Sequence, residues 1–243
     1  MKVYILGIKI DDIKMDQAIQ KVDVWLRGSG SHQIVTTNPE FVMTAQTDLV
    51  FRKILNDADL SIPDGVGLKL SGKIKNTIPG VDLMEKLCEL AVEKDATVGF
   101  LGGRDGVAEK SSECLGKKYP GLKVSFVDKG QSLGIVSSSK SLHSEDAHNV
   151  VAPSRIPQTD ILFVAFGHPK QEKWIAEDLN KLNVKVAMGV GGAFDYISGK
   201  VPRAPIFIRN LGLEWLFRLI IQPWRIKRQI KLLKYTWLVL NSK

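Results

Sequence analysis

The chain has 243 residues, of which 44% are hydrophobic and 25% charged, so it can bury one sizeable core with a small appendage but not several independent domains. Its two cysteines, Cys88 and Cys114, give no sign of a disulfide framework or a zinc site, and a reducing cytoplasm fits best. A net charge of +8 would suit a nucleic acid or an anionic membrane as partner.

The positive charge is concentrated at the C-terminal end of the chain. From Lys200 onward, ten Lys and Arg stand against a single acidic residue, Glu214, which gives a net charge of +9. The first 199 residues hold the other 24 basic and 25 acidic residues and carry a net charge of −1. Any anionic partner is therefore expected to meet the C-terminal segment and not the electrically neutral body.

Strand-length apolar runs alternate with amphipathic helical patterns over most of the body. In chain order we predict a first strand within 1–8, a helix over 14–27, a strand over 33–37, a helix from 38 to about 56, a strand over 58–62, a helix over 82–94, a strand over 97–101, a helix ending at 118, a strand over 122–127, a surface loop over 128–157, a strand over 160–166, a helix over 169–182 and a strand over 184–190. This alternation is typical of an α/β, Rossmann-like fold, in which a parallel sheet carries helices on both faces.

The stretch 206–224 is strongly apolar, but charged residues interrupt it, which argues against a transmembrane span, and Pro223 is expected to end or kink any helix there. The last segment, 224–240, sets Trp, Ile and Leu against Lys and Arg, as in a basic amphipathic helix that docks on a membrane. We therefore predict an α/β domain over residues 1–200 and a membrane-docking helical appendage over residues 201–243. The interleaved apolar residues and the lack of a recognised motif argue against a nucleic acid partner.

Several predicted strands end in Gly- or Pro-containing turns that open helices, at 36–39, 63–67, 102–106, 167–172 and 189–192. In a parallel sheet such turns meet at the edge where the strands end, and helix N-termini there offer free N–H groups to phosphates. A phosphate-bearing substrate is the expected ligand, although close packing also selects glycine. Neither a G-x-G-x-x-G nor a G-x-x-x-x-G-K-[ST] motif occurs, and this argues against an NAD-dependent enzyme and against a P-loop NTPase.

Asp64 follows an apolar strand between Pro63 and Gly65, and two interpretations of it stay open. A carboxylate held partly desolvated at the sheet edge is suited to general-base work on a hydroxyl. An N-cap for the following helix is the interpretation that local sequence alone favours.

Three arginines, Arg218, Arg225 and Arg228, lie on either side of Pro223. The planar guanidinium binds a diphosphate bidentately and keeps its charge. A solvated basic face is the ordinary alternative, but the interleaved Trp and Leu favour substrate phosphates, lipid headgroups or both. The histidines of the predicted loop have no partner at metal-ligand spacing, so no metal site is predicted.

Seven segments, taken in order, resemble the WecG/TagA/CpsF family of glycosyltransferases, with a match from about residue 3 to residue 230. The segments are TNPE at 37–40, PDGVG at 63–67, PGVDL at 79–83, GHPKQE at 167–172, GVGGAFD at 189–195, GKVPRAP at 199–205, and GLEWLFR at 212–218 with PWR at 223–225. Because seven motifs occur in the family's order, chance resemblance is a poor explanation.

The resemblance implies a metal-independent, inverting transfer of a sugar without a cofactor. The donor would be a UDP-sugar, most often of N-acetylmannosamine, and the acceptor N-acetylglucosamine on undecaprenyl diphosphate, in the synthesis of teichoic acid or surface polysaccharide. The enzyme would be peripheral on the inner face of the bacterial plasma membrane. Whether it forms a homo-oligomer is left open by the sequence. The alternatives are a relative that uses UDP-glucose or a uronic acid donor and a non-catalytic membrane-bound adaptor.

The resemblance also implies site residues, position by position. Asp64 falls at the family's proposed catalytic base, which reverses the local preference for a cap, and Thr37 joins it as a catalytic residue. Together with the glycine turns, the expected substrate-binding residues are Asn38, Gly102, Gly103, Gln171, Gly191, Gly192, Arg218, Arg225 and Arg228. Two positions depart from the family's pattern: Thr77 stands where many relatives carry an arginine, and His168 stands where small or apolar residues are common.

Overall fold

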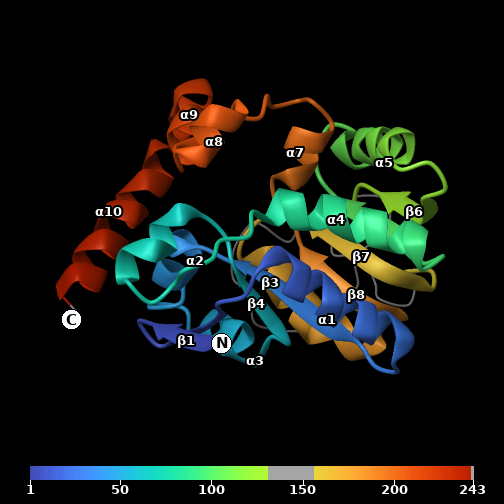
Figure 1. The fold of residues 1–243 in the computed structure, drawn as a ribbon, viewed down its shortest axis with the longest axis horizontal. Coiled ribbons are helices and arrows are strands. Elements are labelled where there is room, and N and C mark those ends of the chain that lie inside the picture. Colours follow the sequence, from blue (N-terminus) through green and yellow to red (C-terminus); the bar gives the residue numbers. More distant parts are fainter. Residues whose placement is uncertain (131–155, 242–243) are drawn as a thin grey trace.

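The computed structural model describes residues 1–130 and 156–241 and, for residues 227–229, the backbone alone. Its centre is a six-stranded sheet in the order β4-β3-β8-β7-β5-β6, in which every neighbouring pair is parallel (Figure 1). The strands are β3 (His32–Thr37), β4 (Leu60–Pro63), β5 (Thr97–Gly102), β6 (Lys123–Asp128), β7 (Thr159–Ala165) and β8 (Val184–Gly189). The predicted parallel α/β sheet is confirmed, while most of the loop predicted over 128–157 lies outside the described residues.

Helices cover both faces of this sheet, as predicted. One group packs around a core that includes Ile34, Phe100 and Phe163, and the other packs on the opposite face, around Val35 and Leu162. The first group is α1 (Met15–Arg27), α4 (Gly80–Glu93), α5 (Val107–Lys118) and α7 (Ala193–Ile197), and the second is α2 (Pro39–Thr44), α3 (Leu49–Asp57) and α6 (Lys170–Asp178), which the 3-10 turn η3 (Leu179–Lys181) follows. Because both faces are covered, the central strands read as near-continuous apolar runs.

The single helix predicted from 38 to about 56 is wrong, because the chain forms α2 and α3 there. Asn38 is the N-cap of α2 and accepts a hydrogen bond from the Phe41 N–H at 3.0 Å. Asp48 caps α3 in the same way and accepts from the Phe51 N–H at 2.9 Å. The second capping side chain starts a new helix, which the apolar pattern alone does not reveal.

The first predicted strand exists but does not join the parallel sheet. β1 (Lys2–Ile5) pairs antiparallel with β2 (Ile8–Asp11) as a separate hairpin. Its two turn residues, Leu6 and Gly7, both have positive φ, of 47° and 78°. The Asp11 carboxylate accepts a hydrogen bond from the Ser61 N–H at 2.9 Å, so the hairpin is fixed to the edge strand β4.

Within the described residues, the appendage forms three short elements and one longer helix beyond α7. They are α8 (Ile206–Asn210), α9 (Glu214–Ile221), the 3-10 turn η4 (Pro223–Arg225) and α10 (Ile226–Asn241). α9 ends just before Pro223, as predicted. Figure 1 shows α8 and α9 beyond α7 and α10 running back past α2, and α10 packs on α2 and on the 3-10 helix η1 (Val66–Ser71). None of the helices within the described ranges is long and apolar enough to cross a membrane.

Candidate active site

Asp64 lies at the edge of the sheet where the six strands end, directly after β4. Its N–H donates to the Thr37 carbonyl at 2.8 Å, so the pairing of β3 and β4 extends by one residue. Its carboxylate accepts a hydrogen bond from the Gly80 N–H in the first turn of α4. The structure does not use Asp64 as a local cap, since Gly65 is the N-cap of η1 and no side chain caps that helix. The carboxylate therefore lies at the positive end of α4.

Burial sets the acidity of Asp64. The residue keeps a partial exposure, but protein surrounds its carboxylate, and the loss of water raises the pKa of Asp64 to about 7. The charges of Glu214 and Asp82 raise this pKa further, while the Gly80 N–H and the charge of Arg203 lower it. A carboxyl group with this pKa is about half ionised at neutral pH and is suited to take a proton from a hydroxyl.

An ion cluster borders Asp64. Arg203 Nη1 lies 2.5 Å from Asp82 Oδ1, and Arg203 Nε lies 3.3 Å from Glu214 Oε1. Asp82 belongs to α4, Glu214 to α9 and Arg203 to the linker between α7 and α8. One guanidinium thus joins the sheet domain to the appendage beside the candidate base.

Thr37 and Asn38 lie next to Asp64 at the end of β3, but the Thr37 hydroxyl and the Asn38 side-chain oxygen are already engaged. The Thr37 side chain is fully buried, and its hydroxyl shares a hydrogen bond with the Ser61 hydroxyl at 2.8 Å. The Asn38 oxygen is the N-cap of α2. Thr37 therefore supports Asp64 through its carbonyl, while its hydroxyl points into the sheet.

Gln171 is buried, with 2% of its surface exposed, and it holds two turns together. Its side-chain oxygen accepts from the N–H groups of Gly167 and Gly191, both at 3.1 Å, and its nitrogen donates to Glu172 Oε1 at 2.6 Å. Since both of its polar atoms have protein partners, Gln171 shapes the turn after β8 from inside. His168 stacks on Phe41, with the centres of the two rings 4.1 Å apart.

Gly102 ends β5 and Gly103 begins the turn that follows it, and both have positive φ. The Gly103 N–H donates to the Ala165 carbonyl at 2.9 Å, and a Cβ at Gly103 would lie 2.5 Å from a methyl of Val107. Close packing between the strand and α5 therefore already requires glycine at 103, whatever ligand this turn meets.

Two of the three predicted arginines come together beside the other glycine turn. Arg218 lies over the Tyr196 ring, with its guanidinium 4.6 Å from the ring centre, and a Cβ at Gly192 would lie 2.6 Å from Arg218 Nη2. Gln222 joins the two arginines, because its side-chain oxygen accepts from Arg218 Nε at 3.3 Å and from Arg225 Nη1 at 3.4 Å. The side chain of Arg228 lies outside the described part of the structure.

Comparison with known proteins identifies the family. The family described as "Glycosyl transferase WecG/TagA/CpsF family" matches residues 3–243, further toward the C-terminus than the motifs reach. Two similar relatives are both named N-acetylglucosaminyldiphosphoundecaprenol N-acetyl-beta-D-mannosaminyltransferase, from Staphylococcus aureus strains MRSA252 and NCTC 8325 / PS 47. Each is 32% identical over 234 residues, which cover 93% of this chain and 87% of the relative. The chain belongs to the WecG/TagA/CpsF glycosyltransferases.

Sequence analysis of this WecG/TagA/CpsF glycosyltransferase missed four polar residues of the site: Asp82, Arg203, Glu214 and Gln222. The first three lie inside quoted motifs, PGVDL, GKVPRAP and GLEWLFR, so their motifs marked the positions but not their mutual contact. Gln222 directly precedes Pro223, and nothing in the local pattern assigns it a role.

Proposed function

We propose that this glycosyltransferase moves N-acetylmannosamine from a UDP-sugar to N-acetylglucosamine carried on undecaprenyl diphosphate, with inversion and without a metal ion. The names of the Staphylococcus relatives support the sugar and the acceptor. The observation that carries the mechanism is the burial of Asp64 at the carboxyl edge of the sheet, which raises its pKa to about 7.

Asp64 is the proposed base. As the acceptor hydroxyl oxygen bonds to the anomeric carbon, Asp64 takes the hydroxyl proton. The bond between that carbon and the UDP oxygen breaks on the opposite side, and UDP leaves with the electron pair. Attack opposite the leaving group inverts the anomeric centre, and the proton ends on Asp64.

Arg218 and Arg225 are the proposed partners of the departing diphosphate, with the Gly192 N–H as a further donor beside them, because Gln171 already accepts from the Gly191 N–H. Their fixed charges stabilise the negative charge that develops on the leaving oxygen. In this proposal they take the place that a divalent metal holds in other transferases. Arg228 is proposed as the third member of the group.

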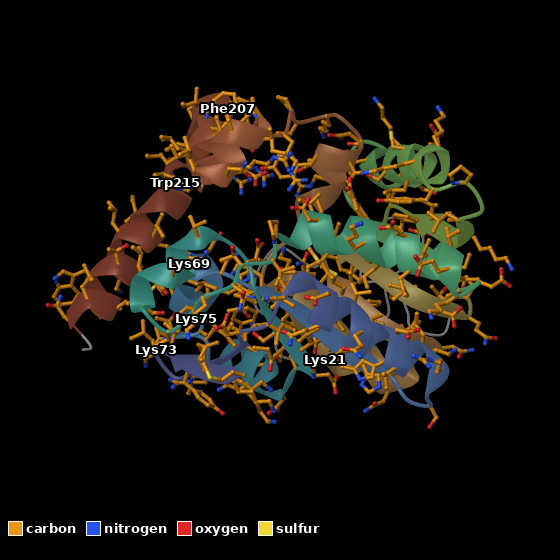
Figure 2. The ribbon with its side chains drawn as sticks, in the orientation of Figure 1. Lys21, Lys69, Lys73, Lys75, Phe207 and Trp215 are labelled. Atoms are coloured by element: carbon orange, nitrogen blue, oxygen red, sulfur yellow. The ribbon has the colours of Figure 1, made fainter. Side chains whose placement is uncertain are left out.

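The appendage is the proposed membrane-docking unit of residues 201–243, and residues 1–200 are the proposed catalytic domain. Large apolar side chains on α8, α9, η4 and α10 are exposed; among them are Phe207, Leu211, Trp215, Ile220, Trp224, Leu233 and Trp237. Figure 2 shows Phe207 and Trp215 at the outer end of the molecule and Lys69, Lys73 and Lys75 further along the same side. Exposed apolar side chains and lysines along one side of the molecule suit the surface of an anionic bilayer, which we propose to be the inner face of the plasma membrane.

The test is an assay of purified protein with UDP-N-acetylmannosamine and a short-chain prenyl-diphosphate-N-acetylglucosamine, in EDTA and on liposomes. We expect UDP release and an extended lipid, and a loss of roughly 10²- to 10⁴-fold in Asp64→Asn. Asp59→Asn is the matched control, because Asp59 precedes the same strand at its opposite end.

Two results would change the proposal. Turnover only with UDP-glucose or a uronic acid donor would keep the family chemistry and correct the sugar. No turnover with any donor would support a membrane-bound adaptor.

A further inference from the structure

Arg203 is a largely buried cation that the proposed chemistry leaves without a role. Only 20% of its side chain is exposed, and its guanidinium contacts Asp82 on α4 and Glu214 at the start of α9. Asp82 is 121 residues away in the chain and Glu214 is 11 residues away. Arg203 is therefore a bridge between the sheet domain and the appendage.

The same three side chains act on the candidate base. Asp64 accepts from Gly80, two residues before Asp82 on α4. The negative charges of Asp82 and Glu214 oppose ionisation of Asp64, and the positive charge of Arg203 favours it. With the Gly80 N–H, these are the polar and charged groups that act on the Asp64 carboxylate from α4, α9 and the linker. The cluster of three has a net charge of −1, which would become −2 without Arg203.

We propose that Arg203 is a positioning residue for the base. It holds α9 against the start of α4 and offsets the negative charges of Asp82 and Glu214, so that Asp64 is ionised when the acceptor binds. This inference rests on the proposed function, because it takes Asp64 as the group that accepts the proton. It adds that the appendage controls the base, since α9 supplies one of the two carboxylates.

A purely structural ion pair would have different consequences. Losing such a pair would lower activity or stability at every pH. Losing the offsetting charge would instead move the acid limb of the pH profile, in a direction set by the sign of the charge removed. The neutral variants of Arg203 and Glu214 must then shift the profile in opposite directions.

The experiment measures kcat/KM against pH for the full-length protein on liposomes, because the acid limb of this profile reports the free enzyme's base. We expect Arg203→Met to move the limb up by about 0.5–1 pH unit, which lowers the rate at pH 6 roughly threefold to tenfold. Glu214→Gln is expected to move it down, because a like charge is removed while Arg203 keeps Asp82. Arg203→Lys should move the limb less than Arg203→Met does, because lysine keeps the positive charge but lacks the planar guanidinium that contacts both carboxylates.

Lys200→Met is the matched control. Lys200 lies in the same linker and pairs with Asp105 on the surface, outside the cluster around Asp64. The acid limb of the pH profile should stay in place in Lys200→Met. If Arg203→Met does not fold, the downward shift in Glu214→Gln decides the question alone.

The two proposals fail in distinguishable ways. An unmoved limb in both Arg203→Met and Glu214→Gln would overturn the role of Arg203 and leave the base intact. An acid limb that persists in Asp64→Asn, with full activity, would instead overturn the base itself.

Discussion

α10 and the pair α8–α9 belong to the same appendage, but different interactions hold them. α10 lies on α2 and η1 and contributes Tyr235 and Val239 to an apolar core, with 0% and 5% of their surfaces exposed. α8 and α9 contribute no buried residue, and polar contacts of Arg203 and Arg218 tie α9 to the sheet domain. Burying apolar surface stabilises a fold strongly, whereas partly exposed ion pairs stabilise it little.

This difference gives the two parts of the appendage different tasks. α10 is an integral part of the folded core. α8 and α9 form a weakly held bridge. It carries Arg218 of the proposed diphosphate site, and its large apolar side chains are exposed. Changes in α10 should therefore act on stability, and changes in α9 should act on catalysis and on binding to membranes.

The largest expected effect is on stability. Tyr235→Ala should lower the free energy of unfolding by about 3–5 kcal/mol, because it leaves a large cavity in the core. Urea unfolding measures this, and Trp237→Ala on the exposed side of α10 is the control. Tyr235→Phe should be close to neutral, since the buried hydroxyl has no hydrogen-bond partner among the described residues. A small effect of Tyr235→Ala would show that α10 is not part of the core.

The second largest effect is expected on catalysis and comes from a change in α9. Arg218→Met should lower kcat roughly 10²- to 10³-fold, because it removes a fixed charge from the place proposed for the leaving group. Its free energy of unfolding should change by less than about 1 kcal/mol, because the ion pair to Asp195 is partly exposed. A large loss of stability with little change in kcat would contradict the division of tasks between α9 and α10.

The raised pKa of Asp64 should make the free energy of unfolding depend on pH. Its pKa is about 7 in the folded state and near 4 in the unfolded chain, so the folded state binds the proton more tightly. The contribution of Asp64 to the free energy of unfolding is then greatest at low pH and is lost as the pH rises from about 4 to about 7. Asp64→Asn removes this loss, and its stability relative to wild type should grow by about 2 kcal/mol between pH 5 and pH 8. A constant difference across this range would show that the pKa of Asp64 is not raised.

The smallest effect on folding is expected at the exposed tryptophan of α9. Trp215→Ala should change the free energy of unfolding by less than about 0.5 kcal/mol. It should nevertheless weaken binding to anionic vesicles, by roughly threefold to tenfold, because the side chain would enter the bilayer interface. Vesicle sedimentation measures this binding, with Val24→Ala on the exposed side of α1 as the control. Equal vesicle binding by Trp215→Ala and Val24→Ala would show that Trp215 of α9 does not contact the membrane.

Sequence patterns predicted the sheet because they are local and repeated. Each apolar run is as long as a strand, and each amphipathic stretch is as long as a helix, so the parallel α/β order follows directly. The break between α2 and α3 was missed because a single capping side chain, Asp48, overrides the apolar period. The separate N-terminal hairpin was missed because its turn depends on positive φ at Leu6, which is rare outside glycine.

The site was predictable where a residue's place in the chain fixes its place in the sheet. Asp64 follows a buried strand, so its position at the edge is certain once the sheet is parallel. The direction of a side chain in a turn is not fixed in this way, and Thr37 and Gln171 both turn inward onto protein partners. Arg203 was missed for another reason, since its partners come from distant segments that only the tertiary fold brings together.

The side-chain oxygen of Gln222 has one more consequence for this enzyme. It accepts hydrogen bonds from Arg218 and Arg225, so two like charges are brought together when the chain folds and not when an anion arrives. The pair is thus a preassembled dication, and a doubly charged ligand finds its counter-charges already in place. Because these charges are close to the surface, the affinity for such a ligand should fall steeply with ionic strength, over a screening length of about 8–10 Å.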